Sequence, residues 1–255
     1  MANEIQIAGL GAMAQKAVMD SVRKEVIGDR PLTPTENKIA EVSANEAVKN
    51  YAFNDIKTEG MKFLDTQVEN LNPYSKGLAK EKRLRYEDKV IYIRKRVDGK
   101  SGIQELFENS DDKVPGITNL SQQKLSDGEN LAVERIEVYF APLAASMTSA
   151  NDAKLKPLEP GTSDAILLNA ELELSSEGNT ILRLPLNKFV DTYLNGAGQK
   201  NGYNLKSPRL IKEKETIQIR LLYPNGSTTA VTTDQKAYID VALIGAGTKP
   251  AQGAY

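Results

Sequence analysis

Gly9, Gly11 and Ala14 stand in IQIAGLGAMAQKAV (residues 5–18) with the spacing G-x-G-x-x-A. This spacing lets a backbone wrap around a pyrophosphate when it follows a strand, opens a helix and belongs to a βαβ unit. A helix does follow here, and Asp29 lies near the place of the acidic residue that such units carry. However, the residues available for a second strand turn at once into an Arg-Pro pair, and the next sixty favour helix. We therefore expect these small residues to open a closely packed helix, and we expect no dinucleotide cofactor.

The rest of the usual catalytic chemistry is missing from the composition. The chain has no Cys, no His and no Trp, which excludes thiol nucleophiles, Ser-His-Asp triads and thiolate or imidazole metal sites. Carboxylates remain, as Glu171 and Glu173 on one face of an expected strand, and as the acidic turn at 108–112. We expect both groups to be solvated, and we expect no catalytic residue, no metal site, no cofactor and no enzyme activity.

Charge offers one candidate binding segment. Lys and Arg number 33 against 34 Asp and Glu, so no overall charge draws the chain to nucleic acid. The run KGLAKEKRLR is locally basic, with the cations Lys76, Lys80, Lys82, Arg83 and Arg85. Two interpretations stay open: a solvated connector, which the lack of interleaved aromatic residues favours, or a contact to the phosphates of nucleic acid. No apolar stretch is long enough for a transmembrane helix, and no basic residues precede the first apolar run as in a signal peptide.

The elements that would position these groups divide the chain into unlike parts. Residues 1–85 are predicted to be helical, with a capping box at Thr33–Glu36 that opens a long helix toward Leu71. This helix carries an apolar stripe, which either packs on its own domain or contacts a neighbouring subunit. The candidate oligomer contacts on the stripe are Val48, Tyr51, Ile56, Leu64 and Val68.

From Lys89 onward the hydrophobic period changes to two. Alternation predicts strands at 89–97, 131–141, 165–174, 179–184, 216–223, 228–233 and 237–244, and short helices are expected at 103–109 and 185–195. Strands that alternate in this way bury one face only, which is typical of antiparallel sheets. We therefore predict a mainly β fold: an antiparallel β-sandwich or jelly roll over 86–248 with a short inserted helix, followed by a flexible tail at 249–255.

Three stretches of the β region carry a family resemblance. They are NTILRLPLNKFVDTYL (179–194), a strand running into a short helix, and the closing strands ETIQIRLLYPNG (215–226) and KAYIDVALI (236–244). This order of elements resembles the jelly-roll capsid proteins of tailless icosahedral bacteriophages. The resemblance implies a structural virion protein without a catalytic site, whose terminal arms contact neighbouring copies. Its implied partners are copies of itself, other virion proteins and packaged nucleic acid.

Two other functions remain as alternatives. A β-sandwich can serve as a binding module for carbohydrate or protein, as in a fibre or adhesin, and Tyr193, Tyr203 and Tyr223 are the candidate aromatic contacts. The absence of Trp weakens this alternative, because carbohydrate sites usually offer aromatic platforms. The third alternative is an enzyme on a β scaffold or one that binds a nucleotide through the glycine motif.

Overall fold

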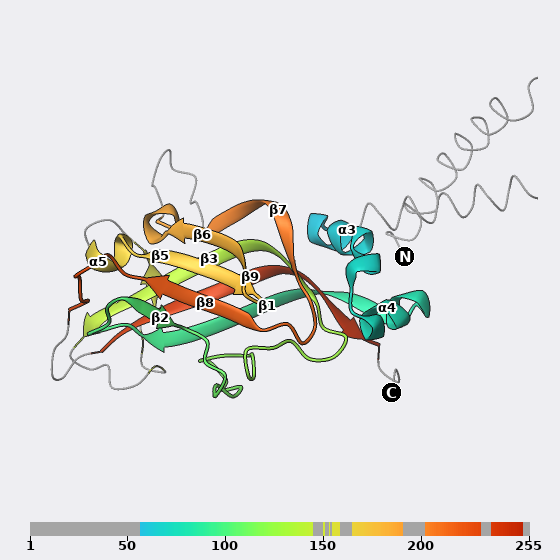
Figure 1. Cartoon of the computed structure of the whole chain (residues 1–255), viewed down its shortest axis with the longest axis horizontal. Helices are drawn as coiled ribbons and strands as arrows, with labels where there is room; N and C mark the ends of the chain where they lie inside the picture. Colours follow the sequence, from blue (N-terminus) through green and yellow to red (C-terminus); the bar gives the residue numbers. More distant parts are fainter. Residues whose placement is uncertain are drawn as a thin grey trace, which may run out of the picture. The chain divides into compact units, whose positions relative to one another are not determined.

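The structure is a computed structural model that describes residues 57–144, 150, 153, 155–158, 165–190, 202–230 and 236–251 (Figure 1). These residues belong almost entirely to one compact unit, Glu59–Tyr255. The glycine motif at 5–18 lies outside the described residues. Among the described helices, none is long and apolar enough to span a membrane. The elements are α3 (Glu59–Thr66), η1 (Val68–Asn70), α4 (Pro73–Lys80), β1 (Leu84–Arg96), β2 (Ile103–Glu105), β3 (Leu131–Ala144), β4 (Lys156–Pro157), α5 (Ala165–Leu168), β5 (Glu171–Ser176), β6 (Asn179–Pro185), η3 (Leu186–Lys188), β7 (Tyr203–Ile211), β8 (Ile217–Leu222) and β9 (Lys236–Pro250).

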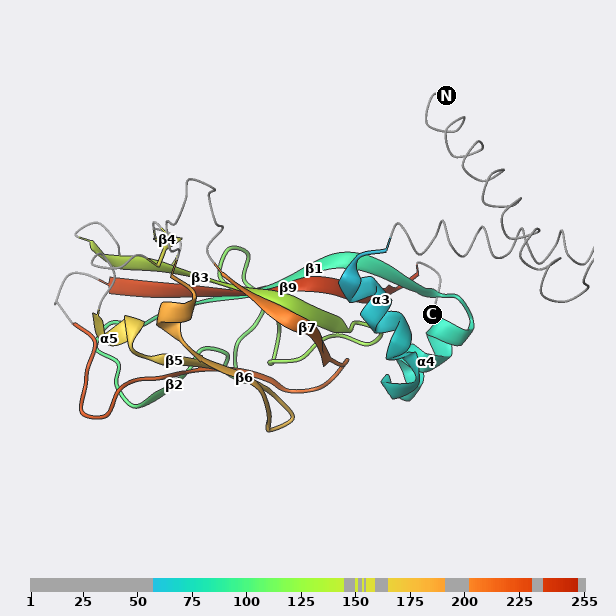
Figure 2. The ribbon, with the colours of Figure 1, turned by 90° about the horizontal axis from the view of Figure 1, so that it is seen from above.

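The strands form two antiparallel sheets that lie as two layers (Figure 2). Sheet A has the order β1–β9–β3, with β7 paired to one end of β3 and the short β4 paired to the other. Sheet B has the order β2–β8–β5–β6. The prediction of a mainly β chain with two antiparallel sheets is confirmed.

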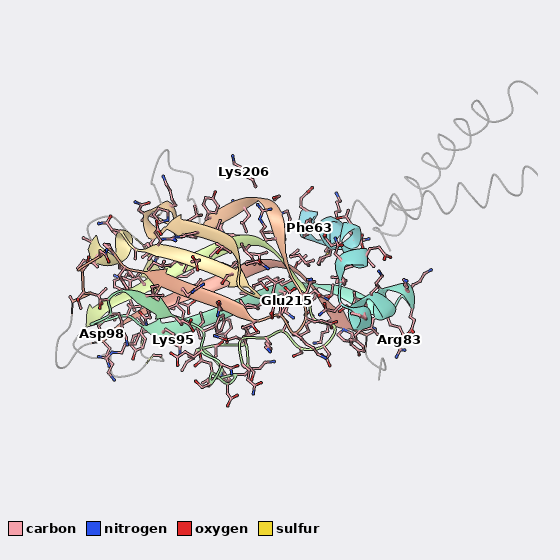
Figure 3. All side chains as sticks on the ribbon, viewed as in Figure 1. Phe63, Arg83, Lys95, Asp98, Lys206 and Glu215 are labelled. Atoms are coloured by element: carbon pink, nitrogen blue, oxygen red, sulfur yellow. The ribbon has the colours of Figure 1, made fainter. Side chains whose placement is uncertain are left out.

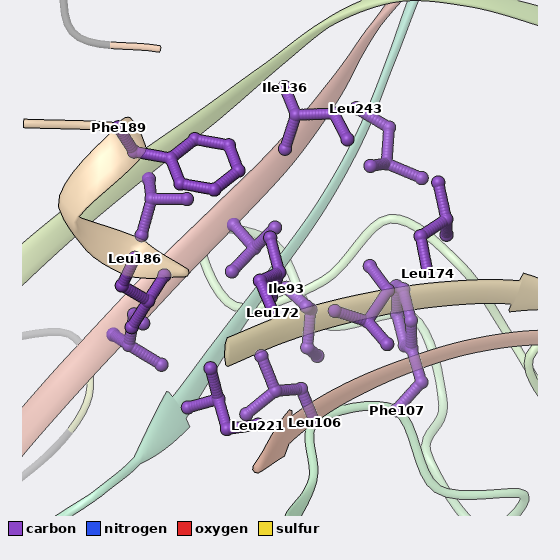
Figure 4. Close-up of a cluster of buried hydrophobic side chains, with 14 of the residues drawn as sticks. Ile93, Leu106, Phe107, Ile136, Leu172, Leu174, Leu186, Phe189, Leu221 and Leu243 are labelled. Carbon is purple, nitrogen blue, oxygen red and sulfur yellow. The ribbon is translucent and has the colours of Figure 1, made fainter. Parts of the chain in front are cut away.

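The main core lies between the two sheets, because alternate residues of each strand point inward. In β8, Ile217, Ile219 and Leu221 are buried, whereas Gln218 and Arg220 face outward. Figure 4 shows how inward side chains of both sheets meet, together with side chains from the segments that follow β2 and β6. The labelled members are Ile93, Leu106, Phe107, Ile136, Leu172, Leu174, Leu186, Phe189, Leu221 and Leu243. Burial of each such side chain stabilises the fold by about 1.5–3 kcal/mol.

Several predicted elements differ from the observed ones. A short helix is expected at 103–109, but Ile103–Glu105 forms the strand β2, and residues 228–230 of the return strand expected at 228–233 are not in a strand. Residues 165–174 were expected to form one strand, but Ala165–Leu168 forms the helical turn α5 and the strand begins at Glu171. A short apolar run fits a buried helical turn as well as a strand, so its periodicity did not distinguish them. The inserted helix expected at 185–195 is described only as the 3₁₀ turn Leu186–Lys188, and its residues from 191 onward lie outside the described residues.

The end of the chain is more ordered than its glycine content indicates. The prediction of a flexible tail at 249–255 is wrong for its first two residues, because β9 continues to Pro250 and pairs there with Leu84. Residues 252–255 lie outside the described part. The glycines of β9 serve close packing: a Cβ on Gly245 would lie 1.9 Å from the carbonyl oxygen of Ala132, and one on Gly247 would lie 2.6 Å from Cδ of Lys89. Glycine in a strand can therefore mark a close approach of backbones, not only flexibility.

A buried carboxylate, that of Asp98, joins the segment after β1 to the start of β9. The side chain of Asp98 has no exposed area and lies at the end of the sandwich opposite Arg83 (Figure 3). It accepts hydrogen bonds from Nε of Arg96 at 2.7 Å and from the backbone N–H of Ala237 at 3.0 Å. Burial by itself raises the pKa of the Asp98 carboxyl, but the hydrogen bonds from Arg96 and Ala237 outweigh it and hold the pKa below its ordinary value.

We expect Asp98→Asn to lower the free energy of unfolding by about 1–3 kcal/mol at pH 7, because a charged acceptor is lost at a buried site. The folded-state pKa is lower than the unfolded one, so the carboxylate stabilises the fold above about pH 4. That contribution is lost as the pH falls through the folded-state pKa. Urea unfolding of both proteins at pH 7 and at about pH 2.5 checks this, and the difference should shrink at the lower pH. An equal difference at both pH values would contradict it. Asp112→Asn, at an exposed position, is the control and should change stability by less than about 0.5 kcal/mol.

Candidate functional site at the helix-bearing end of the sandwich

The helix α3 packs on the face of sheet A that points away from the main core. Leu64 is 1% exposed and forms a small separate core with Ala132 of β3 and Ala246 of β9. The backbone N–H of Gly60, in the first turn of α3, donates to Oε1 of Glu134 on β3 at 2.8 Å. A Cβ on Gly60 would lie 2.7 Å from this carboxylate and 2.9 Å from Cβ of Ala246. Glycine is therefore what allows the start of α3 to approach the sheet so closely.

A second contact of α3 joins it to the first strand. The hydroxyl of Tyr86 in β1 donates to Oδ1 of Asp65 in α3. Burial and the neighbouring carboxylate together raise the pKa of Tyr86 well above its ordinary value. The phenol therefore stays protonated and keeps donating over the whole physiological pH range.

The helix α4 is held by a carboxylate that lies far away in the sequence. Glu213, in the turn between β7 and β8, is 2% exposed. Its carboxylate accepts the backbone N–H of Ser75, in the first turn of α4, at 3.3 Å, and also the backbone N–H of Gly128. The side chain of Asn72, at the N-cap of α4, makes no cap hydrogen bond and donates instead to the carbonyl oxygen of Glu213 at 2.8 Å. The negative charge that stabilises the helix N-terminus thus comes from the β-sandwich.

A buried amide connects the same helix to β9 and to the turn between β7 and β8. Nδ2 of Asn130 donates to Oγ of Ser75 and to Oγ1 of Thr248, each at 2.9 Å, and Oδ1 of Asn130 accepts the N–H of Glu213 at 3.1 Å. All four residues are at most 2% exposed. The described segment 59–80 is therefore fixed to the sandwich by buried polar contacts as well as by apolar packing. The first 58 residues of the chain are joined to the sandwich at this fixed point.

The predicted oligomer contacts fall partly within this region. Leu64 packs inside its own chain, as the first interpretation of the apolar stripe expects, and Val68 is half-buried in η1. Val48, Tyr51 and Ile56 lie outside the described residues. The long helix expected to reach Leu71 is not continuous, because a helix begins at Glu59 and ends at Thr66.

The basic run divides into paired and unpaired cations. Lys76 forms an ion pair with Glu69, and Arg83 pairs with Glu81 at 3.0 Å. Lys80, Lys82 and Arg85 are exposed and form no ion pair with a described residue. The register of β1 and β9 adds a cation that the sequence did not indicate, because Lys249 is the cross-strand partner of Arg85.

We call Lys80, Lys82, Arg85 and Lys249 the cation cluster. Like charges directly opposite each other on paired strands destabilise a sheet, so the pair of Arg85 and Lys249 would gain from a bound anion. We call α3 and α4, which pack on the sandwich, the docked helices. The cation cluster lies beside them, because Lys80 ends α4 and Arg85 is the second residue of β1.

Two of the other acidic candidates take part in ion pairs in the described part of the chain. Glu173 is 8% exposed and pairs with Arg220 at 2.8 Å, so it is not the solvated residue that was expected. Asp111 of the acidic turn pairs with Lys95 at 2.9 Å. The residues described include no group of three or more acidic side chains placed to hold a metal ion.

The tyrosines proposed for carbohydrate binding are used inside the fold. Tyr223 is 6% exposed, and its hydroxyl donates to Gln104 at 2.9 Å. Tyr203 is half-buried and packs against Phe189, with 6.0 Å between the ring centroids. Tyr193 lies outside the described residues. Both described tyrosines therefore take part in contacts within the fold.

Comparison with known proteins gives no relative for this chain: no protein-family model, no curated protein and no solved structure matches it. The fold and the geometry of the helix-bearing end are therefore the basis for its function.

Proposed function

We propose that this chain is a structural subunit with a jelly-roll fold that assembles with copies of itself into the shell of a virion, as capsid proteins of tailless icosahedral bacteriophages do. The observation that carries the proposal is the strand order. When the two-residue β4 is set aside, eight strands remain. If these eight are numbered 1 to 8 along the chain, their spatial order is 1-8-3-6 in sheet A (β1, β9, β3, β7) and 2-7-4-5 in sheet B (β2, β8, β5, β6). A jelly roll built from two Greek keys, an architecture of many viral shells, is expected to have this order, which supports the proposal.

Jelly rolls also occur in lectins and in enzymes that bind ligands between their sheets. The packing between the sheets and the exposure of the aromatic side chains therefore distinguish a scaffold role from a ligand-binding role. The space between the sheets is filled here by apolar side chains (Figure 4). Tyr223, one of the tyrosines considered for sugar binding, is buried, and Tyr203 packs against Phe189. These two findings support a scaffold role over a ligand-binding role.

The docked helices support assembly. The segment 59–80 is fixed to the sandwich by Glu134, Glu213 and Asn130. A rigid base of this kind gives the preceding 58 residues a defined starting point for contacts to neighbouring copies. We propose that these residues form the arm that clamps a neighbour.

Cross-linking of mixed isotopic material tests this arm. Full-length protein is prepared with ¹⁴N and with ¹⁵N, and the two are mixed, reassembled and treated with an amine cross-linker. We expect cross-links that join Lys38 or Lys49 of one isotope to lysines of the sandwich of the other. Cross-links from these lysines exclusively within one isotope would contradict assembly through the arm.

We further propose that the cation cluster contacts packaged nucleic acid. Each neutralised phosphate releases a counterion, so binding to single-stranded DNA should weaken with salt by a slope of roughly 0.7 per contact. We expect the combined variant Lys80→Gln, Lys82→Gln and Arg85→Gln to reduce that slope by about 2 and to weaken binding by at least about tenfold at low salt. Fluorescence anisotropy over a salt series measures both quantities.

The matched control changes three exposed lysines elsewhere, Lys113, Lys124 and Lys206, to glutamine. It removes the same net charge and should leave most of the affinity and slope intact. If the two triple variants bind alike, the contact is a general effect of net charge and the cation cluster has no special role.

A further inference from the structure

A row of alternating charges crosses the outer face of sheet B. Glu105 of β2, Arg220 of β8, Glu173 of β5 and Arg183 of β6 are successive cross-strand partners. We call these four residues the charge ladder. Glu173 contacts both arginines, at 2.8 Å to Nη2 of Arg220 and 4.0 Å to Nη1 of Arg183. Glu105 at one end is exposed and forms no ion pair with a described residue. Arg183 at the other end pairs with Glu171 of the same strand pair, and its side chain stays 51% exposed.

The neighbouring row of the same face is partly apolar. Its members, in the same strand order, are Ile103, Leu222, Glu171 and Pro185. Ile103 is 65% exposed, more than any other large hydrophobic side chain among the described residues. A single exposed apolar side chain is normal on a protein surface, so Ile103 carries weight only because it lies beside the charge ladder.

The two outer faces of the sandwich are covered differently. The outer face of sheet A holds α3 at one end, and at the other Ala150, Ala153 and Leu155 pack on Ala141 and Tyr238. Sheet B forms the opposite layer, and among the described elements no helix lies beyond it (Figure 2). The charge ladder and Ile103 therefore lie on a face that no described helix covers.

We propose that this face binds the same face of a second copy of the chain about a two-fold axis that runs parallel to the strands. Such an axis reverses the order of the strands across the interface and leaves each row opposite itself. Glu105 then faces Arg183 of the second copy, and Arg220 faces Glu173 of the second copy. The order acid, base, acid, base is its own complement under this operation, as an isologous interface requires.

The partly apolar row has the same symmetry, with Leu222 opposite Glu171 of the second copy. The axis places Ile103 opposite Pro185 of the second copy, so the most exposed apolar side chain gains an apolar contact at both ends of the interface. Two sheets whose strands run nearly along the same direction can pack face to face at about 10 Å. The charges fix the register of the two copies and suppress other pairings, which is the role that charge complementarity serves best at interfaces.

Charge reversal at the two ends of the ladder tests the interface in full-length protein. When two Arg183→Glu chains pair, each Glu105 faces a carboxylate at position 183 of the other copy. When two Glu105→Arg chains pair, each Arg183 faces a guanidinium group at position 105 of the other copy. We expect each variant alone to bind its own copies at least tenfold more weakly than the native chain. A mixture of the two variants has opposite charges at both ends, so the mixed pair should regain native affinity. Sedimentation velocity of fluorescently labelled chains measures both.

Recovery by mixing separates a lost interface from a damaged fold, because misfolded chains do not restore each other. Ile103→Asp provides a second variant and should also weaken the pair at least tenfold. Lys206→Glu, on the exposed strand β7, is the control and should leave the pair intact. Native-like association of the separate variants, or weak association of the mixture, would overturn the proposal, as would a native chain that stays single at all concentrations.

The pair does not depend on the proposed function, since the variants lie on sheet B and leave the docked helices unchanged. A chain that forms two-copy species but never larger particles would contradict the virion proposal and support the pair. Particles that form equally well from either charge-reversal variant alone would support the virion proposal and contradict the pair.

Discussion

Glu213→Ala should lower the free energy of unfolding by about 3–5 kcal/mol. The substitution leaves the buried N–H groups of Ser75 and Gly128 without their acceptor, at about 1–3 kcal/mol each, and removes the charge that caps α4. We expect faster hydrogen exchange at Ser75 and along the rest of α4 than in the core strands. Urea unfolding, combined with hydrogen exchange read by mass spectrometry, measures both effects.

Two further variants decide whether the carboxylate itself is responsible. Glu213→Gln keeps one carbonyl acceptor and should lose about half as much stability as Glu213→Ala. Glu81→Ala, at the exposed C-cap of the same helix, removes one surface ion pair and should change stability by less than about 1 kcal/mol. If Glu213→Ala unfolds at the native urea concentration, the polar anchor of α4 has no role in stability.

Gly245→Ala should have the second large effect, a loss of at least about 3 kcal/mol or failure to fold. The added Cβ would lie 1.9 Å from the carbonyl oxygen of Ala132, on a backbone that cannot move without opening the pairing of β3 with β9. Overpacking of this kind, against main chain instead of a flexible side chain, belongs to the strongly destabilising class of substitutions. Thermal unfolding followed by circular dichroism gives the result directly.

Gly77→Ala is the matched control for this substitution. A Cβ at Gly77 meets no atom within 4 Å, and the residue lies inside the helix α4. Alanine favours a helix interior over glycine by about 0.5–1 kcal/mol, so this variant should be slightly more stable than the native chain. Equal melting temperatures for the two alanine variants would contradict the packing role of Gly245.

Much of the β fold could be predicted from the sequence, because exposure alternates along most strands. TIQIRLLY alternates cleanly and becomes β8. The region AILL at 165–168 could not be assigned in this way, since its burial depends on tertiary packing and not on a local period. The strand at 245–250 was missed because its glycines indicate flexibility in sequence terms, whereas their reason is the approach of β1 and β3.

The candidate site was less predictable than the fold. The basic run at 76–85 was visible, but its division into paired and unpaired cations depends on Glu69 and Glu81 being in reach, and Lys249 joins it only through strand register. The capping of α4 by Glu213 spans 138 residues, so no local pattern could reveal it. The charge ladder likewise exists only once four strands from distant parts of the chain are aligned.

The native mass of the purified full-length protein tests the central proposal most directly. Mass photometry over a range of protein and salt concentrations, with negative-stain images of the same samples, gives that mass and the shape of any particle. We predict discrete, closed particles that contain many copies of the 27.9 kDa chain. A folded protein with the mass of one chain, or of one pair, under all of these conditions would contradict a shell-forming subunit.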